Sequence, residues 1–481
     1  MSDSASQPPP PTYLPAPNDA PAGEEIGARA NTVWTRGPGA APAVVGLVGK
    51  GLRGAAGRVA IVDGCRTPFS RSGTDLSEMD VVDLASVAAS ELVQRNAVDP
   101  REIGLAVFGC VVPALDAPNL GREVVLRAGL PATIPGTTVN LACASSNRAI
   151  TTGAEAILTG QCDVVLAGGA ESLTNVPIQV SKGAARRLVE LGKAKTLGQR
   201  LGVISRVRPR DLVPVPPAIA EYTTGKSMGQ SAEKMAQEND VSRRAQDEIA
   251  LMSHRRAAAA AAEGRFAGQI AMVFPLPGYD RAVTTDNGVR ADSSPEALAK
   301  LRPVFDKRYG TITAGNASPL TDGGSAVLLM SEEKARALGH APLGYIRSWA
   351  YAALDPAGQL LQGPAYAAPA ALDAAGMKLG DIDLVEMHEA FAAQILSNLK
   401  AFASKKFARD ELGRSAPLGE VDLDRCNVNG GSIAIGHPFG ATGARVTIQL
   451  LRELERRGLD TGLLTVCAAG AVGLAMVVER E

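Results

Sequence analysis

The sequence predicts an α/β fold made from two copies of one structural unit. Apolar strand-like runs alternate with helical segments, and hydrophobic residues make up 46% of the 481 residues while aromatic residues make up only 4%. A loop, a helix that opens with small residues and an apolar strand occur at 140–169 and again at 429–470. Such internal repetition indicates a duplicated unit, and the length allows a large core. The composition is typical of a soluble protein with closely packed helices.

The first copy is predicted to begin near residue 58. Residues 1–57 are rich in Pro, Ala and Gly, which predicts a flexible tail. RVAIVDGCRTPF at 58–69 then predicts a strand ended by a turn, 79–98 an amphipathic helix and 103–112 a buried strand. We expect this half to span 58–180 and to be completed by 306–333.

The second copy follows the same order within 334–481. Residues 363–379 predict a helix and 381–391 the end of a strand, as 79–98 and 103–112 do in the first copy. The helices that follow 140 and 429 both begin with small residues, so we expect them to pack closely against each other at the centre.

Between the copies, 181–305 is predicted to form an inserted loop domain. It contains an Ala-rich helix at 243–264, ended by Gly264. Its early part is strongly basic and interleaved with apolar residues, which fits either a solvated helical face or an amphipathic interfacial segment. The basic residues are Lys182, Arg186, Arg187, Lys193, Lys195, Arg200, Arg206, Arg208 and Arg210, against the acidic Glu190.

Charge and cysteine usage narrow the classes of function. Forty-nine basic residues nearly cancel fifty acidic ones, so no overall field would recruit nucleic acid. The six cysteines form no CxxC pair, which argues against a metal site and favours a reducing compartment. The start MSDSASQPPPP has no apolar core of a secretory signal, and no run of about 20 apolar residues would span a membrane. We expect a cytoplasmic protein.

Four side chains stand where strands or loops meet segments of small residues. They are Cys143 in NLACASS, His388 in MHEAF, His437 in GHPFG and Cys467 in TVCAAG. A thiol at a helix start is favoured as thiolate by the helix dipole, and glycines around His437 let a ligand approach closely. Each residue alone also fits a structural role, as a small buried thiol or a hydrogen-bonded histidine.

Taken together, these motifs resemble the thiolases, acyl-CoA acyltransferases that cleave or form 3-ketoacyl-CoA. The resemblance covers about Val59 to Glu479 and rests on NLACASSNRA, GNASPLTDGG, HEAF, GHPFGATGAR and CAAG. With His388 where most short-chain thiolases carry Asn, and with the basic insert, the chain is most similar to the thiolase subunit of the fatty-acid oxidation trifunctional complex. The resemblance implies two βαβαβαββ halves packed as a five-layer α-β-α-β-α sandwich.

The resemblance also implies a role for each catalytic residue. Cys143 would attack the 3-keto carbonyl and become acylated, His437 would take its proton, and Cys467 would protonate the departing acetyl-CoA carbanion. His388 and His437 would line one oxyanion pocket, and the N–H groups of Cys143 and Ala469 the other, each donor worth about 3 kcal/mol. Ala471 replaces a usual glycine.

Coenzyme A and acyl-CoA are expected as substrates, with no permanently bound cofactor and no metal. The resemblance implies CoA contacts at Ser227, Met228, Arg290, Ala314 and Ser318, although Ala314 and Ser318 also fit tight-turn packing. It further implies a homodimer or homotetramer, an enoyl-CoA hydratase/3-hydroxyacyl-CoA dehydrogenase partner subunit, and a basic insert that contacts that partner or a membrane.

Two other functions remain open at this point. A decarboxylating condensing enzyme of the ketoacyl-synthase type uses one Cys and two His, but needs no second thiol such as Cys467. A non-catalytic lipid carrier or scaffold would need none of the four side chains.

Overall fold

The computed structural model describes residues 47–50, 57–215 and 220–481. Most of the predicted tail therefore lies outside the described residues. The prediction of a flexible tail is wrong for Leu47–Lys50, which forms strand β1 antiparallel to β8 (Gly344–Ala353). β2 pairs with β8 only at residues 344–346, so the edge of β8 at 348–351 is open for β1.

The N-terminal half contains a five-stranded sheet in the order β5-β4-β6-β7-β2. β4 is parallel to β5 and β6, while β7 is antiparallel to β6 and β2. β7, which lies beyond the insert, therefore completes this sheet. The short β3 (Ser70–Arg71) pairs with β7. The strands of the sheet are β2 (Val59–Arg66), β4 (Leu105–Gly109), β5 (Gly136–Val139), β6 (Val164–Glu171) and β7 (Thr321–Ser331).

The C-terminal half repeats this strand order, except that the counterpart of β5 is reduced to a single bridge. β8 is followed in the sheet by β11 (Val472–Glu479), β10 (Thr461–Ala468) and β9 (Leu384–Met387), with the same parallel and antiparallel steps. Where the third strand of the repeat would stand, one isolated parallel bridge joins Cys426 to Val385. The two sheets are linked through the short pairing of β2 with β8.

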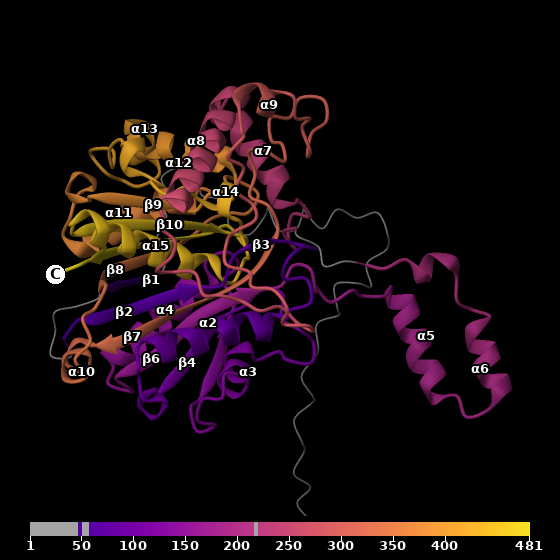
Figure 1. Cartoon of the computed structure of the whole chain (residues 1–481). Helices are drawn as coiled ribbons and strands as arrows, with labels where there is room; N and C mark the ends of the chain where they lie inside the picture. The colour runs from indigo at the N-terminus through magenta and orange to yellow at the C-terminus, as the bar shows by residue number, and fades with distance from the viewer. Residues whose placement is uncertain (1–46, 51–56, 216–219) are drawn as a thin grey trace, which may run out of the picture. The chain divides into compact units, whose positions relative to one another are not determined.

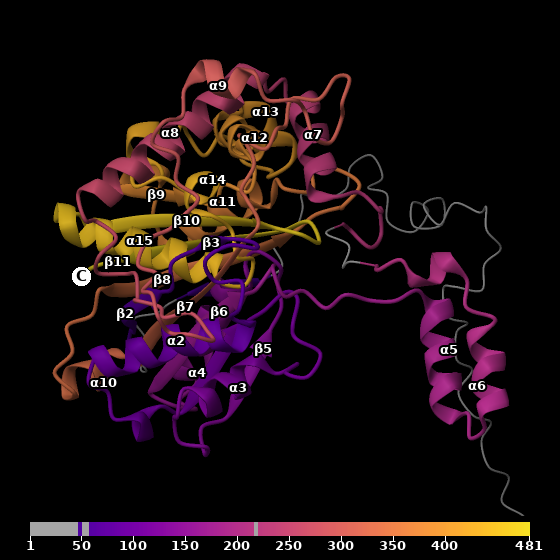
Figure 2. The same cartoon turned by 45° about the vertical axis from the view of Figure 1, so that its right-hand side comes forward.

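Helices form three layers around the two sheets (Figure 1). α2 (Val81–Arg95) and α3 (Leu120–Arg127) cover one sheet, and α11 (Gly363–Ala375) and α12 (Ala392–Ala403) cover the other. α4 (Ser145–Leu158) and α15 (Thr442–Arg457) share a third hydrophobic core with strands of both sheets (Figure 2). The five-layer α/β arrangement is thereby confirmed.

The middle layer depends on small residues, as expected. A Cβ on Gly443 would lie 2.0 Å from Oδ1 of Asn147, so only glycine allows α15 to approach α4 this closely. The amide of Asn147 donates to the Gly443 carbonyl at 3.1 Å, and the Ala444 N–H donates to Oγ of Ser146 at 2.9 Å. These polar contacts fix the register of the two helices at the end where Cys143 and His437 lie.

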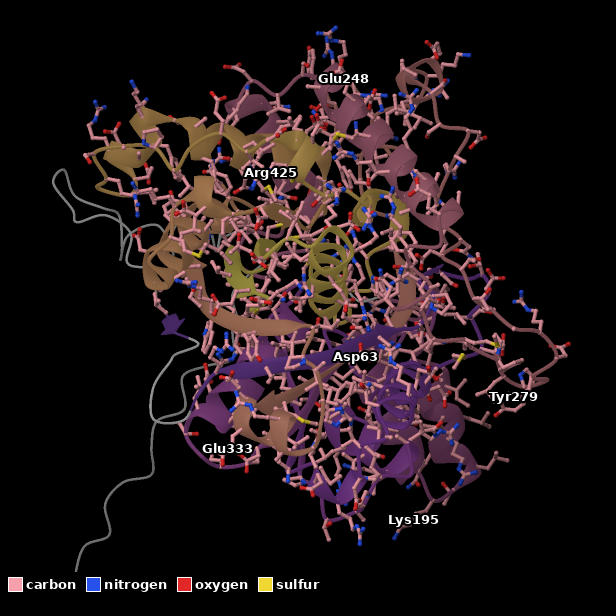
Figure 3. The ribbon with its side chains drawn as sticks, turned by 60° about the vertical axis from the view of Figure 1, so that its left-hand side comes forward. Asp63, Lys195, Glu248, Tyr279, Glu333 and Arg425 are labelled. Carbon is pink, nitrogen blue, oxygen red and sulfur yellow. The ribbon has the colours of Figure 1, made fainter. Side chains whose placement is uncertain are left out.

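A buried carboxylate also links the two halves. Asp63 of β2, labelled in Figure 3, accepts from Arg95 of α2 at 2.7 Å and from Arg452 of α15 at 2.5 Å. Because one acidic group is shared by arginines from both halves, the pairing fixes α15 against the N-terminal sheet.

The insert contains half of the remaining described helices. The predicted Ala-rich helix is confirmed as α8 (Arg243–Ala262), followed by Gly264 with φ +71°. The basic stretch forms two helices, α5 (Lys182–Lys193) and α6 (Leu197–Ile204), which contact each other. The other helices of the insert are α7 (Met228–Glu238), α9 (Pro295–Ala299) and the 3₁₀ turn η2 (Pro209–Leu212).

Short helices complete the rest of the chain. They are η1 (Pro100–Glu102), α10 (Glu332–Ala337), η3 (Leu379–Asp381), α13 (Lys405–Asp410), η4 (Leu423–Arg425) and α14 (Ser432–Ile435). Within the described ranges, no helix has both the length and the hydropathy needed to cross a membrane. The boundaries drawn from the sequence at 180, 305 and 333 stay a prediction.

Candidate active site

The two predicted histidines and the predicted nucleophile lie together at the end of the middle layer. Sγ of Cys143 and one ring nitrogen each of His388 and His437 are all within 4.8 Å of one another. Cys143 lies two residues before the start of α4, His388 directly follows β9, and His437 lies in the loop before α15. The duplicated strand–helix units thus bring residues from both halves to one place.

Cys143 and His437 form a direct hydrogen-bonded pair. Nε2 of His437 is 3.1 Å from Sγ of Cys143, and Nδ1 is 2.7 Å from the hydroxyl oxygen of Thr442. The Thr442 hydroxyl itself donates to the Pro438 carbonyl at 3.0 Å, so its oxygen must accept from Nδ1–H. This pattern assigns the tautomer of His437 in which Nε2 carries a lone pair and faces the thiol, as a general base must.

Burial sets the resting protonation of the pair. Burial raises the pKa of the Cys143 thiol to about 12, although the N–H groups of Ala469 and Cys143 itself act in the opposite direction. Burial and the charge of Arg445 lower the pKa of His437 to about 3. Desolvation therefore opposes the resting thiolate that the start of helix α4 was expected to favour. The pair rests as neutral thiol and neutral imidazole.

The two ring nitrogens of His388 differ in their hydrogen bonding. Nδ1 is 2.9 Å from Oγ of Ser432, whereas the buried Nε2 has no hydrogen-bond partner among the described residues. Ser432 Oγ also accepts from the guanidinium of the buried Arg445 at 2.5 Å. Since the ring centroids of His388 and His437 are 4.1 Å apart, the free Nε2 can serve a substrate oxygen near His437. Burial and the charges of His437 and Arg445 keep the His388 pKa low.

The second thiol lies at the end of β10. Cys467 is fully buried, and burial together with the charge of a Cys143 thiolate raises its pKa, so the two sulfur groups interact. The turn after β10 aims the Ala469 N–H at Cys143. Gly470 and Ala471 both have positive φ, +81° and +56°. Ala471 thus adopts the left-handed conformation that glycine would adopt without strain.

Two carboxylates at the site were missed by sequence reasoning. Glu171, at the end of β6, is fully buried and accepts from the N–H groups of Val111, Val112 and Gly440. It therefore holds the loop of His437 against the N-terminal half. Glu221 of the insert accepts from the Gly470 N–H at 2.5 Å. No spacing along the chain connects either residue to its partner, so no motif could have found them.

The predicted CoA contacts are distributed over several segments. The Ser227 hydroxyl caps α7 by accepting from the Gln230 N–H, and Met228 packs against the core that contains Cys467. The Ser318 N–H donates to the Ala390 carbonyl, and Ala314 is exposed. Arg290 is exposed, and its N–H donates to Nδ1 of His254. These five CoA contacts stay a prediction.

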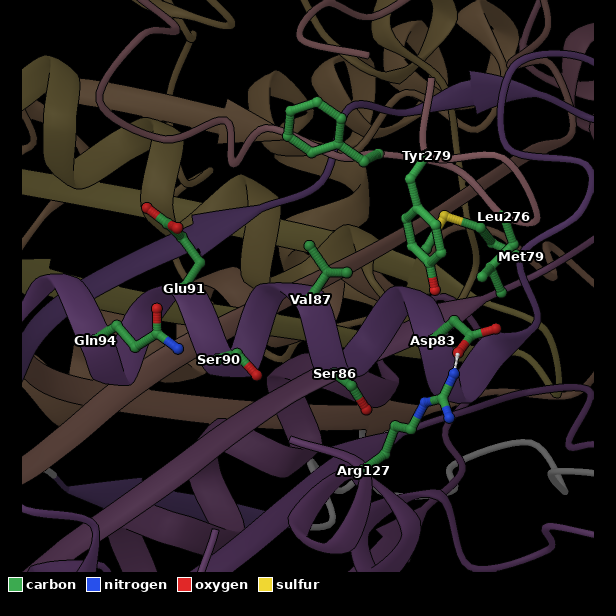
Figure 4. Close-up of a pocket in the computed structure, with 11 residues that line it drawn as sticks. Met79, Asp83, Ser86, Val87, Ser90, Glu91, Gln94, Arg127, Leu276 and Tyr279 are labelled. Carbon is green, nitrogen blue, oxygen red and sulfur yellow. Dashed lines mark hydrogen bonds and ion pairs between the residues drawn. The ribbon is translucent and has the colours of Figure 1, made fainter. Parts of the chain in front are cut away.

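A surface hollow lies elsewhere on the N-terminal half (Figure 4). It is lined by α2, including Asp83 and Glu91, by Arg127 of α3, and by Leu276 and Tyr279 of the insert. None of the predicted site residues lines it. The chemistry thus points to the Cys143 cluster rather than to this hollow.

Comparisons with known proteins agree with this geometry. Residues 59–333 match the family model of the thiolase N-terminal domain, and 340–480 match that of the thiolase C-terminal domain. The chain is 51% identical to proteins named 3-ketoacyl-CoA thiolase from Pseudoalteromonas atlantica and Aeromonas salmonicida, over 88% of this chain and 97% of each relative.

Solved structures give the same result. The acetyl-CoA acetyltransferase of Bacillus anthracis superposes with a TM-score of 0.75 at 32% identity, covering 88% of this chain and 98% of that one. Human mitochondrial 3-ketoacyl-CoA thiolase in complex with CoA superposes with a TM-score of 0.74 at 31% identity, covering 89% and 98%. With both family models matched in order and two thiols and two histidines gathered at the site, the chain belongs to the thiolase family.

Proposed function

We propose that this protein is a 3-ketoacyl-CoA thiolase, an acyltransferase that works through an acyl-cysteine. The observation that supports this most directly is the 3.1 Å contact between Nε2 of His437 and Sγ of Cys143, in a site that also holds a second thiol. The similarity to proteins named 3-ketoacyl-CoA thiolase gives the substrate class.

The first step is attack on the 3-keto carbon. His437 takes the proton of Cys143 as the Cys143 sulfur bonds to that carbon, because both groups rest neutral and the proton must move with the attack. Negative charge then develops on the keto oxygen. The N–H groups of Cys143 and Ala469, which point to the sulfur, are positioned to donate to it.

The second step breaks the bond between the second and third carbons of the substrate. The acyl group stays on the Cys143 sulfur, and the leaving acetyl-CoA carbanion takes a proton from Cys467. His388 Nε2, which has no other partner, and His437 would hold the thioester oxygen while it carries charge. A buried thiol suits the proton donor because its raised pKa keeps it protonated until the carbanion forms.

The third step transfers the acyl group to free coenzyme A. The Cys467 thiolate takes the proton of the CoA thiol as the CoA sulfur attacks the acyl-cysteine, and His437 returns its proton to Cys143, which leaves as a thiol. The products are acetyl-CoA and an acyl-CoA shortened by two carbons. Thiols and imidazoles supply every proton transfer, so the proposal needs no permanently bound cofactor, and coenzyme A acts as a substrate.

A thiolysis assay tests this function. We expect CoA-dependent loss of 3-ketoacyl-CoA absorbance, formation of acetyl-CoA, and a mass increase on Cys143 alone when acyl-CoA is supplied without CoA. Cys467→Ser should slow carbon–carbon cleavage, while acyl-CoA should still acylate Cys143 as it does in the parent. If Cys467→Ser left condensation untouched and malonyl-CoA were decarboxylated, a ketoacyl-synthase type of reaction would replace the proposal.

The cellular setting is proposed on chemical grounds. Fatty-acid β-oxidation is the pathway in which 3-ketoacyl-CoA is cleaved, with a homodimer or homotetramer as the assembly. A cytoplasmic location would keep the catalytic thiols reduced, and all six cysteines are free thiols. Size-exclusion chromatography with light scattering tests the assembly, and fractionation tests the location.

The basic helices α5 and α6 are proposed as an interfacial segment. They leave Leu188, Leu197 and Leu201 exposed beside their basic residues. Such a surface fits either an anionic membrane or an enoyl-CoA hydratase/3-hydroxyacyl-CoA dehydrogenase subunit. Flotation with anionic and neutral vesicles tests binding to a membrane, and pull-down with the purified subunit tests binding to that protein. Leu197→Asp should abolish binding in whichever of the two assays shows it.

A further inference from the structure

The catalytic cluster has the composition of a metal site as well as of an acyl-transfer site. The thiol of Cys143 and ring nitrogens of His388 and His437 converge within 4.8 Å. His388 uses Nδ1 for Ser432, which leaves Nε2 as the atom offered to the cluster. Within the described part of the chain that Nε2 has no hydrogen-bond partner, and His388 is only 1% exposed. A buried nitrogen with a free lone pair or proton therefore faces a thiol and a second imidazole.

We propose that this cluster binds Zn²⁺ reversibly through Cys143, His437 and His388, and that the bound ion inhibits the enzyme. One thiolate and two imidazoles are a preferred zinc donor set, and a fourth position would remain for water. Tetrahedral zinc with these ligands requires about 3.3–3.6 Å between ligand atoms. The Cys143–His437 separation is 3.1 Å, and the widest separation of 4.8 Å would close by about 1.5 Å at most.

The protonation state of the ligands favours binding. The hydrogen bond from Nδ1–H of His437 to Thr442 leaves a lone pair on Nε2, and an Nδ1–H of His388 directed at Ser432 does the same for the second ring. Zinc therefore displaces only the Cys143 proton: the S–H bond breaks, a Zn–S bond forms and one proton leaves to solvent. No oxidant or reductant takes part.

The surroundings also supply outer partners for the ligands. Thr442 accepts from Nδ1–H of His437, so that ring presents Nε2 to a metal. Ser432 can accept from Nδ1–H of His388 in one tautomer, which offers the Nε2 lone pair to a metal, or donate to Nδ1 in the other, which offers Nε2–H to a substrate oxygen. Arg445 opposes a cation at this place. The thiolate cancels one of the two metal charges.

Zinc in this position would remove the nucleophile and its base at once. Inhibition should be competitive with acyl-CoA, because the thioester and the metal need the same Sγ. An enzyme already acylated on Cys143 should not bind the ion.

Cobalt titration tests the site without depending on activity. Co²⁺ added to the full-length protein in a phosphine reductant should give a thiolate-to-cobalt charge-transfer band and tetrahedral d–d bands. We expect one Co²⁺ and about one proton released per chain near neutral pH. Zn²⁺ should then displace the cobalt and abolish both bands.

Variants identify the ligands. Cys143→Ser should lose the charge-transfer band, and His388→Asn should weaken binding by roughly tenfold or more, since outer partners of a ligand alone are worth about 10–100-fold. Cys162→Ser is the matched control, because Cys162 is a half-exposed thiol outside the cluster. It should bind cobalt as the parent does. Circular dichroism establishes that each variant is folded.

The possible outcomes separate this proposal from the proposed function. Thiolysis activity without a cobalt–thiolate band overturns the metal site and leaves the thiolase intact. A band that survives in folded Cys143→Ser, or unchanged affinity in His388→Asn, also overturns it. A band with the expected variant pattern in a protein that cleaves no 3-ketoacyl-CoA supports the metal site and contradicts the proposed function.

Discussion

The tautomer of His437 depends on one hydroxyl, that of Thr442. The hydroxyl oxygen lies 2.7 Å from Nδ1 of His437, and its proton is donated to the Pro438 carbonyl at 3.0 Å. Thr442 is 0% exposed, so no solvent can take over the acceptor role. Thr442→Val keeps the shape of the side chain and removes the acceptor. The Nδ1–H tautomer would then bury an unsatisfied donor.

The expected loss follows from the cost of that donor. An unsatisfied buried N–H costs about 1–3 kcal/mol. The competing tautomer places its proton on Nε2 and offers no lone pair to Cys143. Since about 1.4 kcal/mol is tenfold in rate, kcat/KM should fall roughly 5- to 160-fold. Thr442→Ser retains the hydroxyl and should recover most of the activity.

Two measurements check this reasoning. Thiolysis kinetics give kcat/KM for both variants, and imidazole nitrogen NMR shifts report which ring nitrogen of His437 is protonated. In Thr442→Val the Pro438 carbonyl also loses its donor, in the free enzyme and in the acylated enzyme alike. Calorimetry measures the resulting loss of stability separately from the loss of activity. Full kcat/KM in Thr442→Val, with an unchanged His437 tautomer, would refute the assignment.

Three further predictions concern charge and packing. Arg445→Met should raise the pKa of His437, because the Arg445 charge now lowers it, and should move the acid limb of the kcat/KM pH profile to higher pH. Gly473→Ala should lower the melting temperature and cost at least about 3 kcal/mol, since its Cβ would lie 2.1 Å from the carbonyl carbon of Gly363. Burial would raise the pKa of Glu453, but hydrogen bonds from Arg and Asn side chains lower it to about 2. The ionised Glu453 therefore stabilises the fold at pH values above its unfolded pKa of 4.5. That stability is lost as pH falls from 4.5 toward 2, and urea midpoints should fall more steeply there for the parent than for Glu453→Gln.

The element pattern could be predicted from the sequence because it is local. Apolar periodicity fixed α2 and β4 to within a few residues, and Gly264 ended α8 where expected. Small residues at the start of α4 and α15 indicated their contact, since only such residues permit the approach at Gly443. β1 was missed because its stability comes from an open edge of β8, nearly three hundred residues away.

The sequence by itself determined which chemical groups the site contains. Cys143, His388, His437 and Cys467 stood out because thiols and imidazoles are scarce and each lies where a strand or loop meets the next segment. Only the tertiary structure decided how those groups are poised. Burial made Cys143 a resting thiol, Thr442 oriented His437, and Ser432 with Arg445 left Nε2 of His388 free. Desolvation and hydrogen-bond direction depend on atoms from distant parts of the chain, so no local pattern of residues encodes them.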